Sequence, residues 1–104
     1  MIVKNDMVIR FFEKIFKFKI AAITLFPFIV ISSSTIVDNV LINHEKIHLK
    51  QQLEMCIIPF YIWYLIELKT KGYYNISFEK EAFRNQNNSN YLNKRKLYSF
   101  LRYF

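Results

Sequence analysis

The two histidines of this chain are His44 and His48, and Glu45 directly follows the first of them. On an α-helix, residues four apart lie one turn above each other on the same face, so both imidazoles could ligate one metal ion. Glu45 would lie beside that metal, where its carboxylate could take a proton from a bound water molecule. Because the H-E-x-x-H spacing also arises by chance on unrelated helices, the motif alone leaves a helical coincidence open.

The motif requires a helix, and the sequence predicts one over residues 38–54. Asp38 or Asn39 can cap its start. Polar residues form one stripe of this helix, and apolar residues fill the arc beyond the histidines. The polar stripe comprises Asn43, Lys46, Lys50 and Glu54, and the apolar arc comprises Leu41, Ile42, Leu49, Leu53 and Cys56. The histidines therefore lie at the edge of a buried face.

The composition indicates one folded domain over residues 1–104. Apolar residues make up 53% of the chain, with one Gly and two Pro, which excludes a disordered chain. The single cysteine, Cys56, cannot form an internal disulfide and is expected to be a small buried hydrophobe. The net charge of +7 suits an anionic partner, such as a membrane surface, nucleic acid or an acidic protein. Nucleic acid is disfavoured because it rests on the basic residues 94–96 alone, without a recognised binding module.

Two uncharged, strongly apolar runs cover residues 20–31 and 55–66, and each could form core or enter lipid. The first run is shorter than the roughly 20 residues that a spanning helix needs. Residues 26–32 are rich in Phe, Ile and Val, which predicts a buried strand. A signal peptide is disfavoured because the charged region before this run is long and contains Glu13. We therefore expect a cytoplasmic or peripherally membrane-associated chain.

Four further helices complete the predicted fold, and one of them covers residues 60–71 and ends before Gly72. Residues 6–19 form an amphipathic helix that either packs on the core or lies in a membrane interface. Ser77 can cap a helix over residues 78–84. Residues 91–104 form a basic aromatic helix that either covers the core or contacts a membrane. The predicted class is α+β, predominantly helical, with one buried strand or short hairpin.

A catalytic zinc site needs a third protein ligand, with water in the fourth position. The chain has no third histidine, and in zinc sites of the thermolysin type a Glu from a later helix serves as the third ligand. The candidates are Glu54, Glu67, Glu79 and Glu81. Glu67 is also a simple ion-pair partner for Lys71, one helical turn further on.

The motif and a later segment together resemble a known family. Residues 44–52, with the sequence HEKIHLKQQ, precede Glu79-Lys80-Glu81-Ala82. This pattern is similar to the gluzincin metallopeptidases, and most to minimal versions with H-E-x-x-H-x-x-Q-Q followed by E-x-E-A-D. The resemblance covers residues 41–83 and implies a minimal gluzincin-like core over 38–84. It also implies a zinc ion held by His44, His48 and Glu79, with Glu45 as the general base.

The chain departs from the family pattern at one position. Phe83 stands where the family usually has an Asp that orients a ligand histidine. Loss of such a partner typically lowers metal affinity or activity by about 10- to 100-fold. Asn75 or Asn85 could take its place.

The reach of the chain adds a geometric requirement. One straight helix from His48 to Lys71 would travel about 35 Å, whereas residues 72–77 span at most about 20 Å. Glu79 can reach the histidines only if the chain reverses between residues 54 and 61, where Pro59 can break the helix. Glu81 is the fallback ligand, but it lies about 200° round its helix from Glu79.

The sequence therefore predicts a zinc-dependent metallopeptidase that hydrolyses a peptide or protein substrate. Tyr73 or Tyr74 could stabilise the oxyanion that forms during the reaction. The alternative function is a non-catalytic, metal-stabilised module at a membrane surface or in a protein complex.

Overall fold

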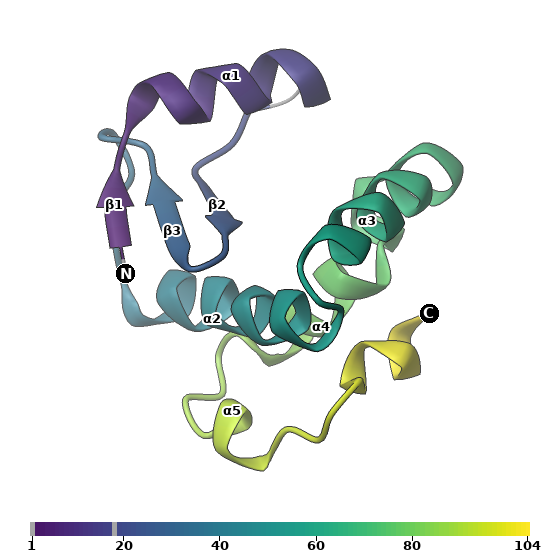
Figure 1. The fold of residues 1–104 in the computed structure, drawn as a ribbon. Helices are drawn as coiled ribbons and strands as arrows, with labels where there is room; N and C mark the ends of the chain where they lie inside the picture. The colour runs from purple at the N-terminus through teal and green to yellow at the C-terminus, as the bar shows by residue number, and fades with distance from the viewer. Residues whose placement is uncertain (1, 18) are drawn as a thin grey trace.

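The computed structural model describes residues 2–17 and 19–104 of the chain, and Figure 1 shows a small three-stranded sheet beside several helices. The secondary structure is mostly helical and includes this sheet, so the predicted class, α+β and predominantly helical, is confirmed. In chain order the elements are β1 (Ile2–Lys4), α1 (Asp6–Phe16), β2 (Ala22–Leu25), β3 (Phe28–Ile31), α2 (Asn39–Glu54), α3 (Ile58–Lys71), η1 (Tyr73–Asn75), α4 (Ser77–Asn85), α5 (Tyr91–Lys94) and η2 (Ser99–Tyr103). The two 3₁₀-helices are η1 and η2.

The sheet has the strand order β1–β3–β2, with β1 parallel and β2 antiparallel to the central strand β3. β3 corresponds to the strand predicted over residues 26–32, and it forms a hairpin with β2. Its consecutive residues Ile29, Val30 and Ile31 are all buried, because the central strand is covered on both faces. This explains why the strand is apolar throughout. α1 contacts β3 and α2 contacts β2, and Figure 1 shows the sheet between these two helices. The sequence did not predict β1.

α1 ends earlier than predicted. The helix predicted over residues 6–19 is observed over Asp6–Phe16, and Lys17 ends it in the left-handed conformation. Residue 18 lies outside the described residues. The side chain of Asn5 caps the start by accepting the backbone N–H of Val8 at 3.2 Å.

A sharp reversal separates α2 from α3. Asp38 caps α2, as expected, by accepting the N–H of Leu41 at 2.8 Å. α2 ends at Glu54, and Cys56 and Ile57 both have positive φ. The expected reversal is therefore present, but Pro59 lies in the first turn of α3 and does not end α2. Cys56 was expected to be buried and is exposed, because it lies in this turn.

A carboxylate from α3 holds the start of α4. Ser77 was predicted to cap this helix, but it is the first residue of α4, and Ile76 occupies the cap position. Glu67 accepts both the Ser77 backbone N–H, at 3.1 Å, and its hydroxyl, at 2.5 Å. Glu67 also forms the predicted ion pair with Lys71, at 3.3 Å. This contact fixes α4 against α3 and so helps to position the first turn of α4.

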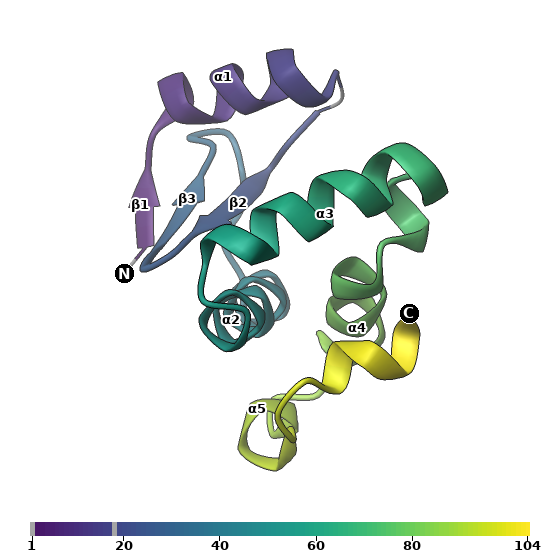
Figure 2. The same cartoon turned by 45° about the vertical axis from the view of Figure 1, so that its right-hand side comes forward.

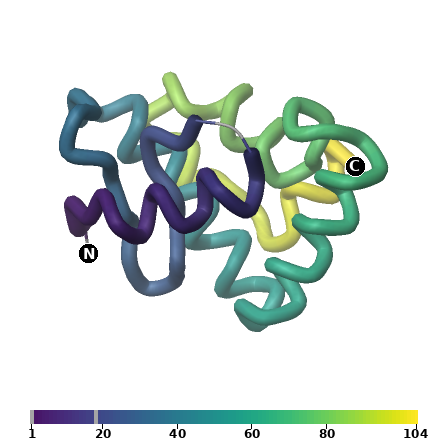
Figure 3. The backbone as a smooth tube through the Cα atoms, turned by 90° about the horizontal axis from the view of Figure 1, so that it is seen from above, coloured from purple at the N-terminus to yellow at the C-terminus, as the bar shows by residue number. Residues whose placement is uncertain are grey.

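The C-terminal segment differs most from its prediction. The helix predicted over residues 91–104 is wrong, because only Tyr91–Lys94 and the 3₁₀ turn Ser99–Tyr103 are helical. Between them Arg95 is extended, and its buried guanidinium forms ion pairs with Glu54 of α2 and Glu81 of α4. These ion pairs hold the backbone away from the helical path. Figure 3 shows β1 and the C-terminal η2 on opposite sides of the molecule.

A second core lies between α3, α4 and the C-terminal segment. It comprises Phe60, Ile76, Phe78 and Phe100. Phe100 thus gives the C-terminal segment the first of the two roles that the sequence left open, covering the core. Among the residues that the structure describes, no helix is long and apolar enough to cross a membrane.

Arg95→Leu tests the importance of these ion pairs. The change leaves the carboxylates of Glu54 and Glu81 buried without their cation, so we expect the free energy of unfolding to fall by about 3–5 kcal/mol. Urea unfolding measures it, with Lys96→Leu, an exposed neighbour, as the matched control. Equal stability of the two variants would contradict a structural role for the ion pairs.

Candidate metal centre

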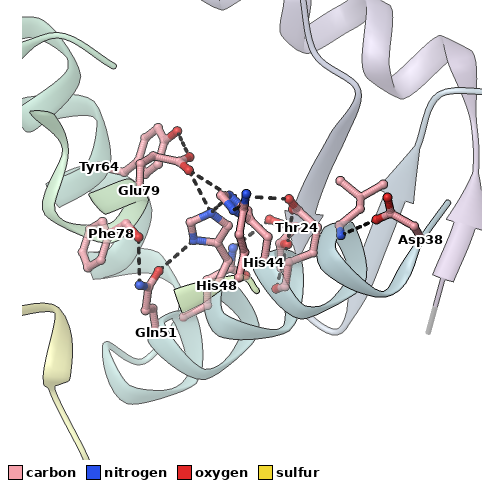
Figure 4. A network of polar contacts seen from close by, with 12 residues as sticks. Thr24, Asp38, His44, His48, Gln51, Tyr64, Phe78 and Glu79 are labelled. Carbon is pink, nitrogen blue, oxygen red and sulfur yellow. Dashed lines mark hydrogen bonds and ion pairs between the residues drawn. The ribbon is translucent and has the colours of Figure 1, made fainter. Parts of the chain in front are cut away.

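His44, His48 and Glu79 meet at one point inside the protein. Their closest atoms form a nearly equilateral triangle, with 3.2 Å between the two Nε2 atoms and 3.1 Å from each of them to Glu79 Oε1. All three side chains are buried. Figure 4 shows the carboxylate of Glu79 directed at both imidazoles. A group of two imidazoles and one carboxylate in this arrangement could hold a metal ion.

Three elements bring the triangle together. α2 presents both histidines on one face, one turn apart, as the helical spacing predicted. The reversal at residues 55–57 sends α3 back, so that the short η1 turn can deliver α4 against α2. Glu79 lies in the first turn of α4, and Figure 2 shows α4 close to α2. The structure thus meets the reach requirement for Glu79.

A glutamine contacts the outer nitrogen of each histidine. Gln86 Oε1 lies 2.7 Å from His44 Nδ1, and Gln51 Oε1 lies 2.8 Å from His48 Nδ1. An amide oxygen only accepts hydrogen bonds, so each Nδ1 donates, and an imidazole that is neutral then has its lone pair on Nε2, directed at the triangle. The amide of Gln51 has one orientation, because its Nε2 donates to Glu81 Oε1 and to the backbone oxygen of Phe78.

The residue that contacts the outer nitrogen of His44 is Gln86. The sequence had suggested Asn75 or Asn85 for this contact, in place of the Asp usual at position 83. Asn75 donates to the backbone of Lys71, and Asn85 donates to Glu81 and Tyr103. Phe83 packs its ring edge-on against His44, with centroids 4.6 Å apart. The sequence did carry a signal for Gln86, since positions 79, 83 and 86 share one helical face.

Glu45 lies beside the triangle and not in it. Its Oε1 accepts a hydrogen bond from the Thr24 hydroxyl of β2 at 2.7 Å, while its Oε2 lies 3.9 Å from His44 Nε2. The neighbouring Gln52 ties β2 to α2 through Thr24 O at 2.7 Å and the Phe26 N–H at 2.9 Å. β2 therefore fixes one oxygen of Glu45 and leaves the other facing the candidate ligands.

Charge is concentrated at this site. Burial disfavours the protonated form of His48, but the carboxylate of Glu79 outweighs burial and raises the pKa of His48 to about 9. Burial likewise opposes ionisation of Glu79, yet the charge of His48 and the contacts with both imidazoles hold the pKa of Glu79 far below its ordinary range. Without a metal, the site is thus a buried ion pair, and a bound cation would displace the proton of His48.

Tyrosines surround the carboxylate of Glu79. Tyr64 donates to Glu79 Oε2 at 2.6 Å, which leaves Oε1 for the histidines. Burial, together with the charge of Glu79, raises the pKa of Tyr64 and of Tyr73, so both phenols stay protonated. Sequence reasoning did not single out Tyr64. Tyr64 lies on the face of α3 that turns toward Glu79 once the chain has reversed, and only the fold identifies that face. Tyr74 is exposed.

The other candidate carboxylates lie elsewhere. Glu81 contacts Arg95, Gln51 and the Tyr91 hydroxyl, so the fallback ligand is fully engaged away from the histidines. Glu54 pairs with Arg95. The Glu67 carboxylate accepts hydrogen bonds from Ser77, Trp63 and Lys71.

The triangle opens onto a cavity of about 630 Å³. Its walls come from α1 and β2 on one side and from α3, η1 and α4 on the other, and Glu45 lies among its lining residues. The lining is largely apolar, and its aromatic residues are Phe12, Phe16, Phe60, Tyr61, Tyr64, Tyr73, Tyr74 and Phe83. A substrate could therefore reach the candidate metal group.

Comparisons of this chain with models of known protein families, with curated proteins and with solved structures give no match.

The ion pair predicts a particular pH dependence of the metal-free protein. Because the pKa of His48 is raised from 6.5 to about 9 by folding, the pair contributes fully below about pH 6.5 and less as the pH rises toward 9. On the acid side, the lowered pKa of Glu79 means that the contribution is lost as the pH falls below about 4.5. We expect the Tm in the presence of a chelator to fall between pH 6.5 and 9. Calorimetry on wild type and His48→Gln measures this, and an equal fall in the variant would contradict the assignment.

Proposed function

We propose that this chain is a zinc-dependent metallopeptidase with a gluzincin-like site. The observation that carries the proposal is the convergence of His44, His48 and Glu79, with Glu45 directly beside them. These four residues are the ones that the resemblance to the family assigned to ligands and base.

The spacing of the three ligand atoms suits zinc. Zinc binds imidazole nitrogen and carboxylate oxygen at about 2.0–2.2 Å in tetrahedral geometry, which separates its ligands by about 3.3–3.5 Å. The observed separations of 3.1–3.2 Å are within a few tenths of an ångström of this spacing. Two neutral imidazoles and one carboxylate also form a ligand set that zinc enzymes use.

The openness of the site favours catalysis over a structural role. Structural zinc sites are closed by four protein ligands, whereas catalytic ones keep a position for water or substrate. Within residues 2–17 and 19–104, the candidate group has three members and faces a cavity. This supports the peptidase over the non-catalytic module.

Each residue has a role in the proposed reaction. Zinc, when bound, would polarise the scissile carbonyl and lower the pKa of a water molecule at the site. The oxygen of Glu45 that Thr24 does not hold would accept the proton of that water and deliver it to the leaving amine. Thr24 would keep Glu45 oriented, and Tyr64 would keep Glu79 oriented. Tyr73, protonated and lining the cavity, is the proposed donor to the developing oxyanion.

Glu45→Gln is the decisive variant for this mechanism. The amide cannot accept the proton, yet it keeps the size and the hydrogen bond to Thr24, so we expect hydrolysis to fall by about 10²–10⁴-fold with zinc content unchanged. The assay is cleavage of an unstructured protein substrate and of a quenched fluorescent peptide mixture, with zinc measured on the same samples.

Lys46→Gln provides the matched control, since Lys46 is the next residue and is exposed. It should hydrolyse as wild type does. Peptidase activity that survives in Glu45→Gln would remove this mechanism.

A further inference from the structure

The outer face of α3 is apolar over more than two helical turns. Ile58, Ile62, Leu65 and Ile66 recur at helical spacing, and each is between 41% and 64% exposed. These four residues are called the α3 stripe below. The first charged residue of α3, Glu67, is buried, so no charge interrupts the stripe.

The opposite face of α3 is already in use. Phe60 belongs to the second core, and Tyr61 and Tyr64 line the cavity of the candidate metal centre. Figure 3 shows α3 at the periphery of the molecule. No segment among the described residues covers the α3 stripe, as the exposure of its members shows. Contiguous apolar surface of this kind on a folded protein marks a site of interaction.

Positive charge at one end of the stripe selects its partner. Lys69 is exposed and continues the line of the stripe beyond Leu65 and Ile66. The chain as a whole carries a net charge of +7. A second copy of the chain packed on this face would bring like charges together, whereas anionic lipid headgroups would neutralise them.

Aromatic residues border the stripe. Trp63 contacts the ring of Phe104 at 5.6 Å, and Lys71 Nζ lies 3.8 Å from the centre of that ring. Tryptophan and lysine at the edge of an apolar face are typical of the boundary between membrane and water. With 14 residues, α3 is too short to span a bilayer, which takes about 20, but long enough to lie in its surface.

We infer that the α3 stripe binds the surface of an anionic lipid bilayer, with the axis of α3 in the membrane plane and Lys69 among the headgroups. The inner face of α3 forms a wall of the cavity. Binding therefore holds that cavity about one helix diameter, roughly 10 Å, from the bilayer. The inference depends on the outer face of α3 alone, so it stands or falls independently of the proposed peptidase activity.

Vesicle binding tests the inference. The chain of residues 1–104, with zinc supplied, is mixed with vesicles of phosphatidylcholine and phosphatidylglycerol in a 3:1 ratio and sedimented. Trp63 is the only tryptophan of the chain and borders the stripe, so its emission should shift to the blue on binding. We expect Ile62→Glu/Ile66→Glu to lower the partition coefficient by about tenfold or more, because two apolar contacts become charged. Lys69→Gln should weaken binding and reduce its dependence on salt.

Ile36→Glu is the matched control, because Ile36 is a strongly exposed isoleucine in a loop outside α3. It should bind vesicles as wild type does. Circular dichroism establishes that each variant is folded. Equal loss of binding in Ile36→Glu, or no binding and no fluorescence shift in wild type, would overturn the inference. So would a wild-type dimer in light scattering that Ile62→Glu/Ile66→Glu dissociates, because a second copy would then cover the stripe.

Discussion

The contact between one carboxylate and two imidazoles is the constraint on which the rest of this structure depends. Glu79 is buried, and an unpaired buried carboxylate is costly enough to oppose folding. His44 and His48 lie on α2, so α4 must approach α2 closely for Glu79 to find its partners. The reversal after Glu54 makes that approach possible. A cation would replace the proton of His48 at the same point, which couples metal binding to the packing of the two helices.

Hydrogen bonds extend from this contact to Arg95 in the C-terminal segment. Arg95 pairs with Glu81, Glu81 accepts from Gln51, and Gln51 accepts from His48. The C-terminal segment thus belongs to the support of the candidate metal centre, although it contributes no ligand. On the other side, Thr24 links the sheet to Glu45. Each side of the centre is therefore held by a different part of the fold, as a site that must keep its geometry requires.

Local patterns predicted the helices that carry the candidate site. The periodicity around His44 and His48 is local to α2, and the reach of the chain was enough to require a turn before α3. The residue Glu79 came from the family resemblance, because spacing alone left four carboxylates open. The sequence placed the chain reversal only approximately. Cys56 and Ile57 both have positive φ, and residues of these two types rarely adopt it, so neither side chain predicts such a turn.

What the sequence could not provide are contacts between distant segments. Gln86 contacts His44 across 42 residues, and Tyr64 reaches Glu79 only because α3 folds back. The helix predicted over 91–104 failed for the same reason. Its apolar and basic pattern suits a helix, but the buried ion pairs of Arg95 with Glu54 and Glu81 outweigh local propensity.

The measurement that tests the account most directly is the zinc content of the purified, folded chain, compared with Glu79→Gln and Glu81→Gln. Both substitutions change a buried carboxylate of α4 to an amide, two residues apart, but only Glu79 faces the histidines. The account predicts one zinc ion per chain in wild type and none retained in Glu79→Gln, whereas Glu81→Gln keeps all three ligands and should still bind zinc, more weakly than wild type because Glu81 supports Gln51. A wild type that takes up no zinc when zinc is supplied, or a folded Glu79→Gln that binds it as wild type does, would contradict the proposed metal centre.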